Sequence, residues 1–136
     1  MKPRLLVVTD KNIVKFEQLK GTKTAISRFG STSELAVRFA LEKKGLVPGK
    51  DVTIVQLGDQ STRFAALTGG SVQSTLISPP FDITARKMGY QILGDMADLG
   101  LPYQHETVAT TDKFLKERPE TARRFLRALS RAFIYG

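Results

Sequence analysis

The chain has 136 residues, 41% of them apolar and 25% charged, which fits about one globular domain and excludes a disordered, collagen-like or coiled-coil chain. It contains no cysteine and one histidine, His105, which excludes disulfides, thiolate catalysis and metal sites built from several Cys or His side chains. The net charge of +8 points to anionic partners or a basic surface.

The first expected element is a short apolar strand at residues 5–9. Only four apolar residues run together there, fewer than the apolar region of a signal peptide needs, so we expect no signal peptide in this chain. No apolar run approaches the ~18 residues of a membrane span. Residues 11–21 are expected to form a linker that ends in a turn.

Three strand–helix units follow. A strand at 23–27 leads into a helix with a Ser or Thr cap, which ends near Lys43, before Gly45. A second strand at 52–57 precedes a helix at 64–68, and a third at 72–77 precedes a helix that ends at Gly89, followed by a strand at 90–93. This alternation predicts an α/β fold, a three-layer sandwich with a mostly parallel sheet and helices on its faces.

The C-terminal segment has a different pattern. After a loop at 94–103, a strand is expected at 105–110 and a strongly amphipathic helix from Pro119. Its apolar stripe consists of Ala122, Phe125, Leu126, Leu129 and Phe133, with arginines around it. This basic segment is either a solvated helix face or a nucleic-acid-binding surface, although interleaved aromatic residues and a recognisable nucleic-acid module are missing.

Polar residues follow three of the expected strands at the same edge of the sheet. In open α/β sheets, ligands bind at the carboxyl ends of the strands, where helix N-termini offer free N–H groups to anions. The same residues also suit ordinary helix caps and turns, and neither GxGxxG nor a P-loop occurs. The candidate ligand-binding residues are Ser27, Arg28, Phe29, Gly30, Ser31, Thr32, Asp59, Gln60, Ser78, Pro79, Pro80 and Phe81.

Within this set, backbone and hydroxyl groups are expected to donate hydrogen bonds to an anionic or polar solute. Phe29 and Phe81 are expected to act as apolar walls. Catalytic patterns are missing: there is no GxSxG elbow, and Asp95 and Asp98 have no third carboxylate nearby. We therefore expect no enzymatic activity, no cofactor and no metal.

Five segments, in order, resemble motifs of solute-binding proteins of ABC importers, in the nitrate, taurine, alkanesulfonate and thiamine-precursor branch. Residues 16–27 resemble its DLKGK-x-VAV motif, and residues 45–52 resemble GL-x-P-x-DV. The later segments 64–72, 79–89 and 114–120 resemble AL-x-x-G-x-VDA, P-x-x-x-x-A-x-x-x-G and FL-x-x-x-PE. Gln73 stands where this group often has Asp, and the Cys-rich motif of thiamine-precursor synthases is missing.

The resemblance implies a single lobe of a type II periplasmic-binding fold, mainly the second of two lobes. Residues 1–17 would be a crossing strand and linker, 18–102 the ligand-binding lobe, and 103–136 a returning strand and C-terminal amphipathic helix. In the intact family, hinge closure around a small anionic or polar solute presents it to a membrane permease, outside the cytoplasm, often from a lipid anchor.

Two further expectations concern partners. The alternative function is a stand-alone nucleic-acid-binding module that uses the basic C-terminal helix, although we expect no nucleic-acid partner. The apolar stripe of that helix needs a covering surface, which favours a homodimer formed by exchange of the terminal segments.

Overall fold

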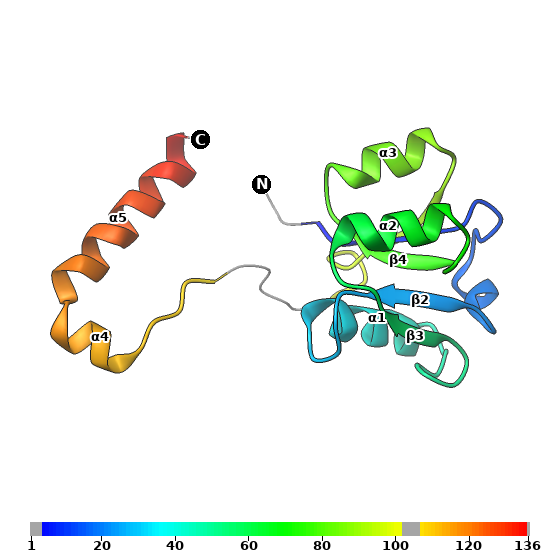
Figure 1. The fold of residues 1–136 in the computed structure, drawn as a ribbon, viewed down its shortest axis with the longest axis horizontal. Helices are drawn as coiled ribbons and strands as arrows, with labels where there is room; N and C mark the ends of the chain where they lie inside the picture. The colour runs from blue at the N-terminus through cyan, green and yellow to red at the C-terminus, as the bar shows by residue number, and fades with distance from the viewer. Residues whose placement is uncertain (1–3, 102–106, 136) are drawn as a thin grey trace. The chain divides into compact units, whose positions relative to one another are not determined.

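The computed structural model describes residues 4–101 and 107–135, which fall into two compact units (Figure 1). The first unit, Met1–His105, contains every strand among the described residues. The second, Glu106–Gly136, contains two helices. None of the helices in these described ranges is long and apolar enough to cross a membrane.

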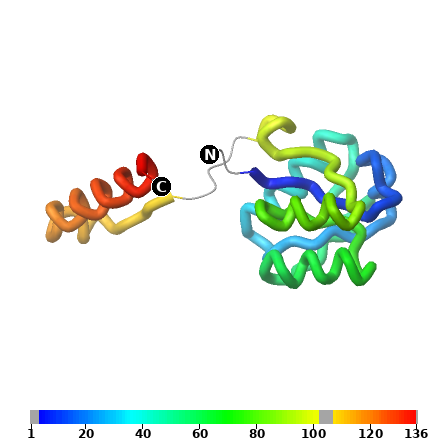
Figure 2. Tube along the Cα trace, turned by 90° about the horizontal axis from the view of Figure 1, so that it is seen from above, coloured from blue at the N-terminus to red at the C-terminus, as the bar shows by residue number. Residues whose placement is uncertain are grey.

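In the described part of the first unit, five strands form one sheet. The strands are β1 (Leu6–Thr9), β2 (Lys23–Ile26), β3 (Thr53–Gln56), β4 (Ser74–Ile77) and β5 (Gln91–Asp95), arranged in the order β3-β2-β4-β1-β5. β2 pairs in parallel with β3 and β4, whereas β1 lies antiparallel between β4 and β5 (Figure 2). The predicted α/β fold with a mostly parallel sheet is therefore confirmed.

Helices cover both faces of this sheet. α1 (Thr32–Lys43) packs on one face through Ala36, Val37, Ala40 and Leu41, whose spacing places them on one side of the helix. α2 (Gln60–Thr68) and α3 (Phe81–Lys87) contribute Leu67 and Ala85 to the core on the opposite face. The unit thus has the three layers that the sequence predicts.

β1 shows why the sheet is buried on both sides. Leu5 and Val7 belong to the core under α1, while Leu6 and Val8 belong to the core under α2 and α3. Successive side chains of a strand point to opposite faces, so this short apolar segment contributes to both cores.

The segment expected as a linker at residues 11–21 contains a short 3-10 helix, η1 (Phe16–Leu19). Its Phe16 and Leu19 are buried in the core on the α1 side of the sheet. The segment is therefore part of the packed unit, because these two apolar side chains cover the sheet.

The second unit consists of α4 (Asp112–Glu117) and α5 (Pro119–Tyr135). α5 begins at Pro119, as predicted, whereas α4 was not predicted. A strand was expected at 105–110. His105 and Glu106 lie outside the described residues, and residues 107–110 form neither helix nor strand. A strand needs a neighbour for its backbone hydrogen bonds, and the described part of this unit contains none.

Candidate functional site

The candidate site lies at the carboxyl edge of the sheet in the first unit. Neighbouring strands β2 and β4 continue into helices on opposite faces, α1 and α3, and such a divergence creates a crevice between their loops. An open depression of about 810 Å³ lies at this edge. Its lining residues are Leu5, Ser27, Arg28, Gly30, Ser31, Thr32, Ser33, Gly58, Asp59, Gln60, Arg63 and Ser78.

Three serine hydroxyls form a cluster beneath the loop between β2 and α1. The Oγ atoms of Ser27, Ser31 and Ser33 lie 2.8 to 3.0 Å from one another. Ser31 caps α1, since its Oγ accepts from the backbone N–H of Glu34, and the N–H of Ser27 donates to Ser33 Oγ. The cluster fixes the path of this loop.

The first turn of α1 also offers backbone donors. The N–H groups of Thr32 and Ser33 have no acceptor among the described residues, as expected for the first positions of a helix. The N–H of Gly30 already donates to Glu34, at 2.6 Å from its Oε2. This leaves Thr32 and Ser33 as the donors that this helix can direct at an anion.

Four lining residues were not among the candidates of the sequence analysis, namely Leu5, Ser33, Gly58 and Arg63, and Arg63 is the charged one. It belongs to α2, is 7% exposed and lines the depression. Its Nε donates to the carbonyls of Gly58 and Asp59 at 3.2 and 3.3 Å, and its Nη1 donates to Leu76 O and Thr75 Oγ1. Burial lowers the pKa of its guanidinium, and the nearby Asp59 opposes this.

No carboxylate forms an ion pair with Arg63 in the described ranges, and no protein acceptor is found there for its Nη2. A buried charge without a counter-ion is costly, which marks a position where an anion would be favourable. One signal in the sequence could have identified it: a cation near a helix N-terminus opposes the helix dipole.

Loops from β3 and β4 are joined at the other side of the depression. Ser78 N–H donates to Gln60 Oε1 at 2.7 Å, and Gln60 Nε2 donates to Ser78 O at 3.2 Å. Asp59 caps α2 through Oδ1, which accepts from Thr62 N–H at 2.7 Å. The loops after β2, β3 and β4 therefore meet, as the sequence predicts for the polar members of the candidate set.

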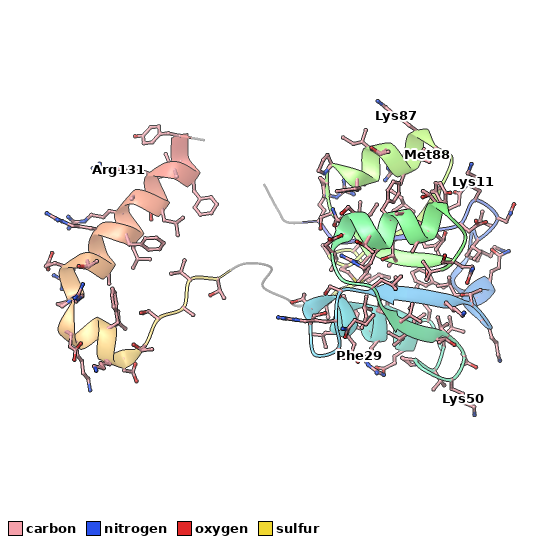
Figure 3. The ribbon with its side chains drawn as sticks, viewed as in Figure 1. Lys11, Phe29, Lys50, Lys87, Met88 and Arg131 are labelled. Atoms are coloured by element: carbon pink, nitrogen blue, oxygen red, sulfur yellow. The ribbon has the colours of Figure 1, made fainter. Side chains whose placement is uncertain are left out.

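The apolar members of the set lie elsewhere. Phe29 is 54% exposed and is not among the lining residues, and its backbone N–H donates to Gln56 Oε1. Its position is labelled in Figure 3. Phe81 packs edge-on against Phe64, with ring centroids 5.7 Å apart, in the core under α2 and α3. Neither of these two rings, which were expected to act as apolar walls, therefore lines the depression. Pro79 and Pro80 are exposed and also lie outside the lining.

Solved structures resemble this chain. The periplasmic aliphatic sulphonate-binding protein SsuA from Escherichia coli is 24% identical, with a TM-score of 0.66 over 91% of this chain and 39% of that one. A putative periplasmic sulfonate-binding SsuA from Methylobacillus flagellatus KT is 26% identical, with a TM-score of 0.61 over 87% of this chain and 36% of that one.

A third structure, the alkanesulfonate-binding SsuA from Xanthomonas axonopodis pv. citri bound to MOPS, is 21% identical. It has a TM-score of 0.74 over 95% of this chain and 44% of that chain. The chain thus spans less than half the length of these three structures. Its first unit resembles a single lobe of the periplasmic-binding-protein fold, as the sequence predicted.

These neighbours are binding proteins, in agreement with the expectation that the chain is not an enzyme, and they give no support to the nucleic-acid alternative. No curated protein matches the chain. The family described as NMT1/THI5 like matches residues 3–135, nearly the whole chain. The chain therefore belongs to the NMT1/THI5-like family.

Proposed function

We propose that this chain binds a small anionic solute in the depression at the carboxyl edge of its sheet, as part of the substrate-binding component of an ABC importer. The observation that carries the proposal is Arg63, a buried guanidinium that lines the depression and has no ion-pair partner among the described residues. A solute oxyanion would supply the missing counter-charge.

The donors around Arg63 suit an oxyanion. The guanidinium presents Nη2, and the first turn of α1 presents the N–H groups of Thr32 and Ser33. Arg28 adds a second cation from the exposed side of the depression. Charged hydrogen bonds of this kind are short and strong when water is excluded, which favours sulfonate-like or nitrate-like groups.

In the whole protein, the proposal places this depression in a cleft between two lobes. Residues 18–102, together with β1 in the middle of their sheet, would be the lobe that carries the site, and residues 103–136 would connect to the other lobe. Hinge closure would then bury the solute and present the closed protein to a membrane permease on the extracytoplasmic side. Two of the similar structures are periplasmic sulfonate-binding proteins, which supports this assignment.

An NMR titration tests the proposal. Methanesulfonate added to the ¹⁵N-labelled chain should shift the amide signals of residues 27–33 and 58–63 and of Ser78. Binding should be weak, above the micromolar range, because the depression is open on one side. Arg63→Met, which removes the charge and keeps an apolar stem, should weaken binding roughly tenfold or more.

Arg86→Met is the matched control, since Arg86 is an exposed arginine of α3 outside the lining, and it should bind as the parent chain does. Arg28→Met is a second test that leaves the core untouched, because Arg28 is exposed. Methanesulfonate shifts that are absent, or that gather away from these three loops, would contradict the proposal.

A further inference from the structure

The charges that line the depression do not cancel. Arg28 and Arg63 contribute two positive charges and Asp59 contributes one negative charge, which leaves a net charge of +1. Two neighbouring arginines are already paired with carboxylates: Arg38 Nε lies 2.8 Å from Glu34 Oε1, and Arg4 Nε lies 2.8 Å from Asp95 Oδ2. Asp82, buried in α3, has no ion pair among the described residues, but it lies outside the lining.

Asp59 is held in place at the rim of this depression. Its Oδ1 accepts hydrogen bonds from the backbone N–H of Thr62 at 2.7 Å and from Ser61 Oγ at 2.8 Å. These bonds, the one from Thr62 first, lower the pKa of the carboxyl group to about 2. The carboxylate is therefore a fixed negative charge at neutral pH.

We infer that the depression selects solutes that carry a single negative charge, and that Asp59 is the residue that disfavours a second one. The inference rests on the proposed function, because it concerns the same site. A monoanion compensates the net charge of the lining. A dianion would bring an uncompensated negative charge close to the carboxylate of Asp59.

Asp59 and Arg63 are close enough for this effect. Both residues line the same depression, and the charge of the Asp59 carboxylate acts on the Arg63 guanidinium, so an oxyanion on Arg63 also lies within the electrostatic reach of that carboxylate. Two like charges about 7 Å apart near a protein surface repel enough to change a binding constant by roughly fivefold or more. This repulsion would give different affinities to two ions of the same shape that differ only in charge.

The test compares methanesulfonate with inorganic sulfate, two tetrahedral ions that carry one and two charges at neutral pH. Both are titrated by NMR into the parent chain and into Asp59→Asn at constant ionic strength, since salt screens the repulsion. The parent should prefer methanesulfonate. Asp59→Asn should raise the affinity for sulfate, relative to methanesulfonate, by about fivefold. Asn is also a good helix cap, so α2 should persist.

Two variants keep the result interpretable. Asp59→Ser also retains a capping side chain without the charge and should behave like Asp59→Asn. Asp51→Asn removes a carboxylate that also accepts a backbone N–H bond, from Val47, but lies outside the lining, and it should leave the preference unchanged.

The outcomes separate the two proposals. The charge selection is overturned, and the proposed function left intact, if the parent chain binds sulfate as tightly as methanesulfonate. The same holds if Asp59→Asn leaves the ratio of the two affinities unchanged. Amide signals at the three loops that respond to neither anion overturn the proposed function, and the charge selection with it.

Discussion

The two units of this chain bury their apolar side chains to very different extents. In the first unit, the central strands β1 and β4 are buried along their whole length, with helices on both faces of the sheet. In the second, no described residue of α4 or α5 is buried, and Phe125 and Leu126 are 54% and 52% exposed. The same apolar residue types thus form a closed core in one unit and an open stripe in the other.

The difference reflects how each pattern is satisfied. A strand that is apolar on both faces needs two helical layers, and residues 4–101 contain both. A helix with one apolar stripe needs one covering surface, and α4 supplies only part of it for α5, where Ala122 and Leu129 are half-buried. On the other side of α5 are arginines such as Arg131 (Figure 3). In the second unit, the apolar stripe of α5 is therefore only partly covered by α4.

The largest effect should come from the centre of the sheet. Leu76 on β4 is fully buried, so Leu76→Ala should lower the free energy of unfolding of the first unit by about 2–5 kcal/mol. Leu126→Ala on α5 removes the same atoms from an exposed position and should leave that free energy unchanged. Urea unfolding of both variants measures the contrast, and equal losses would show that the stripe on α5 is part of the same cooperative core.

A smaller effect is expected at the helix caps. Ser31 caps α1 and also joins the serine cluster, so Ser31→Ala should cost the first unit about 1 kcal/mol. Thr111 caps α4 in the same way, with its Oγ1 3.1 Å from Phe114 N. Thr111→Ala should not change the free energy of unfolding of the first unit. A loss of about 1 kcal/mol in that free energy, as for Ser31→Ala, would contradict this expectation.

Substitutions in the apolar stripe of α5 should affect the fold of the first unit least, but they should change the mass of the particle in solution. We propose that the stripe is covered by a second copy of the chain, because burying each Phe or Leu contributes roughly 1.5–3 kcal/mol. Light scattering of the parent should then give a dimer. Phe125→Asp should give a monomer with the first unit intact, whereas Val14→Asp, at a comparably exposed site of the first unit, should not. A monomeric parent chain would end this proposal.

Much of the first unit is predictable from local sequence. The strands at β2, β3 and β4 and the end of α1 follow from β-branched runs, caps and Gly45, and the structure agrees to within two residues. The place of β1 was not predictable, because its antiparallel pairing is set by residues at least 65 positions away. α4 was missed because its six residues are too few for a helical periodicity to be recognised.

The site was predictable only in part, for the same reason. Ser27, Ser31, Asp59 and Ser78 follow strand ends, so the sheet topology brings them together. Arg63 was missed because its burial depends on carbonyl groups of other segments, including Leu76 O on β4. Phe29 and Phe81 lie outside the lining of the depression, and residue type alone does not indicate whether a ring faces solvent, the core or a ligand.

The central position of β1 has a consequence for how the chain reaches its fold. Leu6 lies opposite Ile77 and Asp95, which follow it by 71 and 89 positions, so the middle of the sheet cannot close until those segments are available. Contacts of such long range slow folding, because the loop entropy is lost before the contact is gained. During synthesis on the ribosome, the apolar run Leu5–Val8 would stay unpaired while about seventy further residues emerge. Exposed apolar segments of this kind are prone to aggregation, which is the hazard that chaperones reduce.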